Sequence, residues 1–387
     1  MKALNQLKTF QRILGSYPAE TPLSKFLPGF YRQNKQMGST DRRVASRLIY
    51  NYFRLGKALF NTSSEERLLV AEFLCNTQTN SFLQHFKPEW ALCVGFDTDE
   101  KIKLVKTAYP GFELSDVFPW SANISGGIDK NAFLKSHFIQ PDLFIRIRKG
   151  FDQHVKALLT KADIVYKDEG NGCLALPNGT RLETVLPQQS WFEVQDLSSQ
   201  QTAGYFKPQR WEAWWDACEA SGGKSLLLHG QQPDLKLVVS DIRESVLTNL
   251  DDRFQQAGLI KYQKKLLDLT QNIDPELHDY AFDGIILDAP CSGSGTWGRT
   301  PEMISQFQPQ KLEFFQRLQQ SIAANVVKYL KPGKPLIYIT CSVFKAENED
   351  TVNFMVKELG MKVEEQTVLK GYENKADTMF VARLVKI

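Results

Sequence analysis

The fold of this chain is decided by residues 282–290, FDGIILDAP, where a short apolar run ends in an acid, an alanine and a proline. Short apolar runs of this kind alternate with helical segments after Lys207. Such alternation of β and α elements predicts a doubly wound parallel sheet, a Rossmann-like α/β fold over residues 206–387, with ligands at the carboxyl ends of the strands. The other segments of this pattern are WEAWWDACEASGGKSLLLHG (211–230), LKLVVSDIRESVLTNLDDRF (235–254), IKYQKKLLDLT (260–270) and KPLIYITCS (334–342).

A glycine-rich turn and several acids mark the predicted strand ends. In DACEASGGKS (216–225), a strand runs into a Gly-Gly turn and a helix, so that backbone N–H groups and the positive helix end face a ligand. About 20 residues later Asp241 ends the second strand, where an acid suits the ribose hydroxyls of a nucleoside. Asp268 and Asp288 end the next two apolar runs. Each acid alone is equally well explained as a helix cap, but their recurrence favours a nucleoside site.

Two cysteines are expected at the same edge of the sheet. Cys291 follows the run that ends at Asp288, and Cys341 directly follows the run PLIYIT. A lone cysteine is by default an inert core residue, whereas two thiols in polar loops at strand ends are harder to explain by packing. A thiolate becomes a nucleophile when cations or helix N-termini lower its pKa, and Lys224 and Arg299 are the candidates for that role.

The first 130 residues are predicted to form a basic, all-helical domain. Residues 1–60 hold eleven Lys and Arg against two acids, although the net charge of the whole chain is only +3. A basic arm attracts polyanions through phosphate contacts, and the alternative is a solvated helical surface. In DRRVASRLIYNYFRLGKALF (41–60), apolar residues recur at helical spacing after an N-cap expected at Ser39 or Thr40, and SEERLLVAEFLC (64–75) repeats the pattern. The basic face of the first of these helices, expected to bind RNA phosphates, carries Arg42, Arg43, Arg47 and Arg54.

Residues 136–205 have a different sequence pattern and are predicted to form a small α+β domain, similar to an RRM. Three short β-like runs surround one helical segment, FDQHVKALLTKA (151–162). A further helix is expected to start at Ser198 or Ser199. The β-like runs are DLFIRIRKG (142–150), ADIVYKD (162–168) and GCLALPNG (172–179).

Composition excludes several classes of protein. No stretch approaches about 18 uninterrupted apolar residues, and the N-terminus is polar where a signal peptide would be apolar, so we expect a cytoplasmic protein. We also expect a monomer. The six cysteines form no C-x-x-C pair, and the five histidines do not cluster with them. A disulfide framework and a metal site are therefore not expected.

Six motifs stand out when they are taken together. They are QDLSSQ (195–200), DACEASGGK (216–224), Asp241, DAPCSGSGTWGRTPE (288–302), TCSVFKAENED (340–350) and FVARL (380–384). In this combination the chain resembles the RsmB/Sun-type RNA cytosine-5 methyltransferases, which use S-adenosylmethionine. The glycine loop of that family reads Cys-Ala-Ala-Pro-Gly-Gly-Lys, whereas Glu219, Ala220 and Ser221 follow Cys218 here. The stretch MGSTDRRVASRLIYNYFRLG (37–56) is similar to the NusB-like helical domain of the ribosomal-RNA members.

The resemblance implies a mechanism and a role for each site residue. C5 of cytosine is too electron-poor to attack a methyl sulfonium, and a thiolate that adds to C6 converts the ring to an enamine-like nucleophile. Cys341 would be that nucleophile, Asp288 would hold the amino and ring-nitrogen edge of the base, and Cys291 would act in the release step. S-adenosylmethionine would be held by Cys218, Glu219, Ala220, Ser221, Gly222, Gly223, Lys224, Asp241, Asp268 and Asp288.

The expected substrate is a cytosine in looped or single-stranded RNA, with ribosomal RNA favoured, because the base must leave any stacked helix to react. Trp297 and Arg299 could line the RNA entry, or their loop could serve only to turn the chain. A non-catalytic RNA-binding or ribosome assembly factor on the same fold is one alternative, and a transfer-RNA methyltransferase is another. A DNA cytosine methyltransferase fits less well, because such enzymes carry a single Pro-Cys nucleophile without a Thr-Cys-Ser partner.

Overall fold

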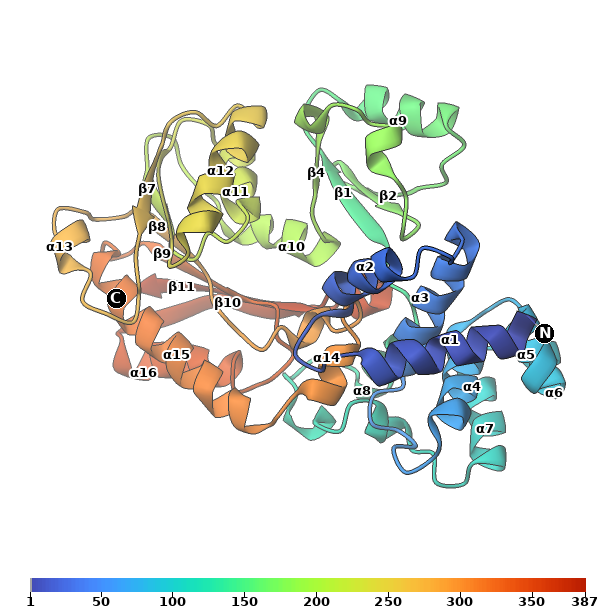
Figure 1. Ribbon diagram of the computed structural model, residues 1–387. Helices are drawn as coiled ribbons and strands as arrows, with labels where there is room; N and C mark the ends of the chain where they lie inside the picture. Colours follow the sequence, from blue (N-terminus) through green and yellow to red (C-terminus); the bar gives the residue numbers. More distant parts are fainter. Residues whose placement is uncertain (1) are drawn as a thin grey trace. The chain divides into compact units, whose positions relative to one another are not determined.

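The structure, a computed structural model, describes residues 2–387, which fall into two compact units (Figure 1). The helical unit comprises the chain up to Ala122, Asp129–Gln140 and Thr296–Pro309. The sheet unit comprises Asn123–Ile128, Pro141–Gly295 and Gln310–Ile387. The units divide the chain differently from the three domains expected at 1–130, 136–205 and 206–387, whose boundaries stay predictions.

The helical unit is built from amphipathic helices that bury their apolar faces against one another. The predicted pattern at 64–75 coincides with α4, whose N-cap Ser63 accepts a hydrogen bond from the Glu66 N–H. The N-cap expected at Ser39 or Thr40 is wrong, because α3 already begins at Ser39 and Gly38 precedes it without a side-chain cap. The helices are α1 (Lys2–Ser16), α2 (Leu23–Gln33), α3 (Ser39–Arg54), α4 (Ser64–Cys75), α5 (Ser81–Phe86), α6 (Pro88–Cys93), α7 (Thr98–Ala108), α8 (Lys130–Ser136) and α14 (Glu302–Gln306).

A small antiparallel sheet opens the main part of the sheet unit, with strand order β2-β3-β1-β4. The predicted helix between its first two strands is present as α9 (Asp152–Lys161), whereas two short 3-10 turns, η3 (Leu182–Thr184) and η4 (Gln189–Trp191), separate the last two strands. Asp196 caps α10 (Leu197–Gln201), which begins one residue before the expected start. The strands are β1 (Leu143–Ile147), β2 (Lys167–Gly170), β3 (Cys173–Leu176) and β4 (Phe192–Val194).

The predicted doubly wound sheet is present, with strand order β10-β11-β9-β8-β5-β6-β7. The five strands from β9 to β7 in this order are parallel, and β11 and β10 add an antiparallel edge. The chain winds from β5 to β6 and β7 on one side and then crosses to β8 and β9 on the other, so the winding reverses between β5 and β8. Ligands of this fold bind at such a switch point. The strands are β5 (Ala213–Asp216), β6 (Lys236–Asp241), β7 (Tyr262–Leu266), β8 (Gly284–Asp288), β9 (Pro335–Thr340), β10 (Met361–Leu369) and β11 (Met379–Lys386).

Helices cover both faces of this sheet (Figure 1). Neighbouring strand residues point to opposite faces, so Trp214 packs with α11 (Gly223–Gln231) and α12 (Glu244–Gln256). Trp215 packs in the core on the other face, with α15 (Gln310–Val326), α16 (Glu349–Glu358) and the short α13 (Asp274–Leu277). Strands buried on both faces explain the continuous apolar runs of the sequence.

Candidate active site at the carboxyl ends of the strands

The two thiols that the sequence singled out lie next to each other. Cys341 follows β9 directly, Cys291 lies three residues beyond β8, and these two strands are parallel neighbours. The two Sγ atoms are 3.3 Å apart, within hydrogen-bonding distance for sulfur. This hydrogen bond and burial raise the pKa of Cys291 well above its ordinary value, so Cys291 is a protonated thiol that can donate to the Cys341 sulfur. The expectation that nearby cations lower the thiol pKa is therefore wrong for Cys291.

A buried glutamate clamps the two thiol loops together. Glu347 is fully buried, and it accepts hydrogen bonds from the Ser292 N–H and the Ser292 Oγ, both at 2.6 Å. It also accepts one from the Ser342 Oγ, in the loop that follows Cys341. Burial raises the pKa of Glu347, and the hydrogen bonds from the two serines act in the opposite direction. The sequence named Glu347 only as part of a motif, so its positioning role went unpredicted.

A glycine lets a third segment approach the thiols. The Gly295 N–H donates to the Cys341 carbonyl at 2.9 Å, and the Thr378 N–H donates to the Gly295 carbonyl at the same distance. A Cβ at position 295 would lie 1.8 Å from the Thr378 carbonyl oxygen. Only glycine fits here, so this loop glycine does more than turn the chain.

Asp288 and Lys224 form an ion pair at the switch point. Asp288 ends β8, and its Oδ2 atom lies 3.0 Å from the Lys224 Nζ at the start of α11. Lys224 also donates to the Ser199 Oγ at 2.8 Å, and Gln195 Nε2 donates to the Gly223 carbonyl at 3.3 Å. Lys224 therefore pairs with Asp288 rather than with a thiol. Residues of the motif QDLSSQ form hydrogen bonds to the glycine loop and to Lys224, a role that the sequence did not reveal.

The glycine loop that joins β5 to α11 contains two residues in the left-handed region. Gly222 adopts φ +88°, and a Cβ there would lie 2.8 Å from the Phe254 ring, so this position requires glycine. Ala220 is also left-handed, with φ +48°, and its N–H donates to the Asp241 Oδ2 at 3.1 Å. Burial raises the pKa of Cys218 well above its ordinary value, so this thiol is not ionised. The backbone of the loop, rather than its thiol, is suited to bind a ligand.

The strand-end acids differ in their surroundings. Burial acts to raise the pKa of Asp241, but hydrogen bonds from the Arg243 side chain and backbone hold it below its usual value. Asp268 lies two residues beyond the end of β7 and accepts from the Thr270 N–H at 3.0 Å and the Thr270 Oγ1 at 2.6 Å. Asp241 is an ionised acceptor beside the glycine loop, whereas Asp268 caps a turn.

A second buried glutamate connects the small sheet to the glycine loop. Glu193 in β4 pairs with Arg148 and, at 2.7 Å, with Arg253 of α12. Arg253 also donates to the carbonyl oxygen of Ser221. A cavity of about 660 Å³ beside this network is lined by both arginines and by Glu193. Ser221, one of the residues that departs from the family pattern, is thus held by its carbonyl group.

The arginines expected to bind RNA have different surroundings. The prediction for Arg54 is wrong as it stands, because its side chain is only 1% exposed and donates to the carbonyls of His137 and Ile139. Arg47 pairs with Glu72 at 3.0 Å, and Arg42 donates to the Met37 carbonyl at 2.9 Å. Arg43 is exposed. The three outer arginines stay candidates for phosphate contacts, whereas Arg54 is a structural residue.

The second half of the motif DAPCSGSGTWGRTPE belongs to the helical unit. Trp297 is 1% exposed and packs against Phe118 and Phe307, so it cannot line an RNA entry. Arg299 is half-buried in the same segment, and its RNA contact stays a prediction. Glu302 is fully buried and accepts from the Leu23 N–H at 3.0 Å, where α2 begins. This segment therefore anchors the helical unit.

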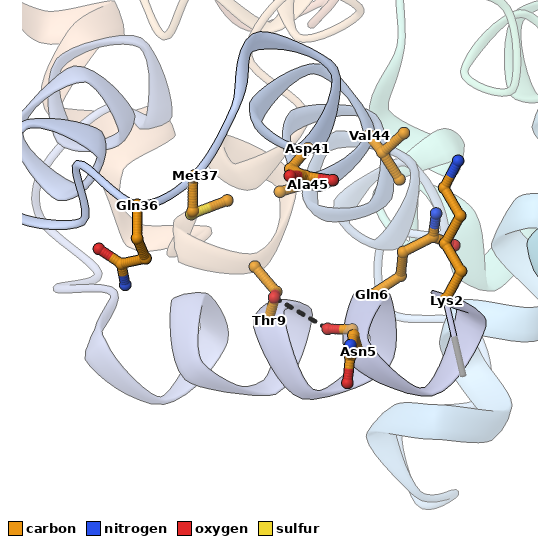
Figure 2. Close-up of a pocket in the computed structure, with 9 residues that line it drawn as sticks. All are labelled: Lys2, Asn5, Gln6, Thr9, Gln36, Met37, Asp41, Val44 and Ala45. Atoms are coloured by element: carbon orange, nitrogen blue, oxygen red, sulfur yellow. Dashed lines mark hydrogen bonds between the residues drawn. The ribbon is translucent and has the colours of Figure 1, made fainter.

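A small hollow of about 210 Å³ lies between α1 and α3 (Figure 2). Its floor includes Thr9, whose Oγ1 donates to the Asn5 carbonyl at 2.9 Å. Lys2 and Asp41 also line it, so the charge of the hollow does not favour phosphate. Among residues 2–387, no group of three or more His, Cys, Asp and Glu side chains is placed to hold a metal ion. No helix in the same range is long and apolar enough to span a membrane.

The C-terminal half of the chain has known relatives. Residues 203–385 match the family model described as 16S rRNA methyltransferase RsmB/F. The chain is 30% identical over 234 residues to the ribosomal RNA small subunit methyltransferase B of Salmonella arizonae, a match that covers 54% of this chain and 52% of that protein. It is 28% identical over 311 residues to the protein of the same name from Enterobacter sp. strain 638, and this match covers 77% of this chain and 62% of that protein. The crystal structure of PH0851 has a TM-score of 0.69 at 17% identity, over 92% of this chain and 93% of that chain, and shows the same fold.

The matches cover this chain and its relatives to different extents. The chain spans about half the length of the Salmonella protein that it matches. The likeness of the helical region to NusB stays a prediction, because the family model begins only at residue 203. The RsmB/Sun-type resemblance is confirmed for the C-terminal half, where residues 203–385 match the RsmB/F methyltransferase family model.

Proposed function

We propose that this protein is an S-adenosylmethionine-dependent RNA methyltransferase (EC 2.1.1) that acts on C5 of a cytosine in ribosomal RNA. The observation that carries the proposal is the pair of thiols, whose Sγ atoms are 3.3 Å apart. One of them, Cys291, lies three residues along the chain from Asp288, which pairs with Lys224. A structural core cysteine would not need a second thiol and a buried clamp beside it. The names of the relatives support ribosomal RNA over transfer RNA as the substrate.

The residues around the glycine loop fit the cofactor. The loop has left-handed backbone at Ala220 and Gly222 where it enters α11, and Asp241 beside it is an ionised acceptor for ribose hydroxyls. The proposed cofactor residues are those expected from the sequence, from Cys218 to Lys224 together with Asp241, Asp268 and Asp288. When bound, S-adenosylmethionine supplies an electrophilic methyl group.

In the proposed reaction, the Cys341 sulfur attacks C6 of the cytosine and forms an S–C6 bond. The electron pair displaced onto C5 makes this carbon nucleophilic toward the methyl group that bound S-adenosylmethionine would supply, with S-adenosylhomocysteine as the leaving group. Asp288 binds the amino and ring-nitrogen edge of the base, and Lys224 keeps this carboxylate in place. After transfer, Cys291 gives its own proton to water, and its ionised sulfur then takes the proton from C5. The electron pair of the C5–H bond restores the C5–C6 double bond, and the S–C6 bond breaks with its electron pair returning to the Cys341 sulfur. A thiol with a raised pKa is a strong base once it is ionised, which suits Cys291 for this step.

The exposed Arg43 and the partly exposed Arg42, Arg47 and Arg299 are proposed to contact RNA phosphates. A cytosine in a loop or single strand fits best, because attack on C6 needs access to the face of the base. A monomeric, cytoplasmic protein stays a prediction.

Cofactor binding separates this function from a non-catalytic RNA-binding or assembly factor on the same fold. Calorimetric titration with S-adenosylmethionine is expected to give one site per chain. Bisulfite sequencing of RNA from cells with and without the gene is then expected to show one cytosine that loses methylation. If no cofactor binds in the micromolar range, the assembly-factor alternative holds.

A further inference from the structure

Two carboxyl groups are buried together beneath the glycine loop. Asp216, the last residue of β5, is fully buried, and Glu219 in the loop is 3% exposed. The Ser225 Oγ lies 3.0 Å from the Asp216 Oδ2 and in closer hydrogen-bonding contact with the Glu219 Oε2. The other oxygen of each carboxyl group is buried without a hydrogen-bond donor among the described residues.

The hydroxyl proton of Ser225 is not enough to make hydrogen bonds to both carboxyl groups. A hydroxyl group has one proton, so Ser225 can donate to only one of the two carboxyl groups. The second contact requires a carboxyl group that donates to the serine oxygen. The geometry therefore needs at least one protonated carboxyl group.

The cations near Asp216 and Glu219 do not replace the proton that these two carboxyl groups require, because each cation is paired with another acid. Lys224 of α11 faces Asp216 but is paired with Asp288 of β8 at 3.0 Å, and Asp288 itself adds negative charge. Arg253 of α12 faces Glu219 but is paired with Glu193 at 2.7 Å. Burial raises the pKa of Asp216 to about 6, and burial and the neighbouring Asp216 raise the pKa of Glu219 well above its ordinary value.

Glu219 also connects the loop to its surroundings through its backbone. Its N–H donates to the Ser240 carbonyl at 2.9 Å, and its carbonyl accepts from the Gly222 N–H at 3.1 Å. The side chain adds a link to the end of β5 and to the first turn of α11, at a position where the related loop pattern has alanine. Movement of this side chain would therefore move the loop.

We propose that Glu219 is a positioning residue, which shares a proton with Asp216 and thereby holds the glycine loop in the conformation that binds the cofactor. The part of this inference that concerns the cofactor rests on the proposed function. Loss of the shared proton leaves two anions in one buried site, and their repulsion displaces Glu219 and the loop. Because both carboxyl groups have raised pKa values, their contribution to stability is present at low pH and is lost as the pH rises through those values.

The test compares Glu219→Gln, which keeps a hydrogen-bond donor but cannot ionise, with the wild type between about pH 6 and about pH 9. Glu244→Gln, at an exposed position at the start of α12, is the matched control. Without cofactor, the Tm of the wild type is expected to fall by about 3 °C more than that of Glu219→Gln over this range. The Kd for S-adenosylmethionine is expected to rise about tenfold in the wild type and to change by less than about twofold in Glu219→Gln.

Infrared spectroscopy of protein with carbon-13-labelled aspartate and glutamate reports protonated carboxyl groups, and the difference spectrum between the wild type and Glu219→Gln separates the shared proton from other buried carboxyl groups such as Glu347. A protonated carboxyl band near neutral pH in this difference spectrum supports the proposal, and its absence overturns it. Parallel pH profiles of Tm for the wild type and Glu219→Gln also overturn it. If the Tm profiles diverge but no cofactor binds at any pH, the shared proton is supported and the proposed function fails. If Glu219→Gln does not fold, the difference spectrum between the wild type and Asp216→Asn decides in the same way.

Discussion

The thiol loops and the glycine loop follow strands of the same sheet, and each rests on a buried glutamate. Glu347 beneath the thiol loops receives three hydrogen bonds, from the Ser292 N–H and from the hydroxyls of Ser292 and Ser342. Glu219 beneath the glycine loop shares the single hydroxyl of Ser225 with Asp216. The two buried glutamates therefore differ in how many hydrogen-bond donors they have, and this difference gives them different roles. Glu347 fixes a geometry through donated hydrogen bonds, whereas Glu219 depends on a shared proton.

The two regions are expected to be separable by mutation, and Cys341→Ser has the largest effect. Methyl transfer is expected to fall by a factor on the order of 10⁴ or more, because the covalent step is lost. The Kd for S-adenosylmethionine should stay within about twofold of the wild type, because the glycine loop is intact. The measurements are single-turnover methylation of RNA and calorimetry, with Cys93→Ser in α6 of the helical unit as control. Activity that survives in Cys341→Ser contradicts the assignment.

Glu347→Ala breaks the clamp of the thiol loops without touching the glycine loop. The free energy of unfolding is expected to fall by about 3 kcal/mol, because three donors lose a buried carboxyl partner. Turnover should fall with it, whereas the cofactor Kd should not change. Urea unfolding and calorimetry measure the two quantities. A cofactor Kd that weakens as much as turnover would show that the two loops are not independent.

The sequence predicted the β and α elements of the Rossmann-like sheet and both thiols, because these features follow from local patterns. Apolar runs report buried parallel strands, and the residue after each run must lie at the carboxyl edge. This logic placed Cys291, Cys341, Asp241 and Asp288 correctly at that edge.

What the sequence could not predict depends on contacts between distant segments. The clamp at Glu347 joins residues 55 positions apart, and no local pattern reports such a bond. The burial of Arg54 was missed because its partners, residues 137–140, lie more than 80 positions along the chain. Its place on the helix looked solvent-exposed by spacing alone. Trp297 was misplaced for the same reason, since its loop packs into the helical unit.

Gly222→Ala tests the glycine loop alone. The left-handed φ and the contact with the Phe254 ring are expected to cost about 2 kcal/mol of stability and to weaken cofactor binding about tenfold. Turnover at saturating cofactor should be close to that of the wild type. Gly258→Ala is the matched control, because Gly258 has φ +76° and open space around its Cβ. Equal losses in the two variants would remove the specific role of Gly222.

Asp268→Ala is expected to have the smallest effect. Loss of one hydrogen-bond acceptor for the cofactor would weaken the Kd about fivefold, whereas the loss of the turn contacts to Thr270 changes stability by less than about 1 kcal/mol. Calorimetry and thermal unfolding measure these two effects. An unchanged Kd would leave Asp268 as a turn cap only.

The division of labour between the two thiols is tested most directly by trapping the RNA adduct. Each variant, Cys291→Ala and Cys341→Ser, is incubated with S-adenosylmethionine and substrate RNA and then analysed on a denaturing gel. Cys291→Ala is predicted to accumulate a covalent protein–RNA complex, because the S–C6 bond forms but C5 keeps its proton. Cys341→Ser is predicted to form none. A complex that accumulates in Cys341→Ser instead would exchange the two roles and contradict the proposed mechanism.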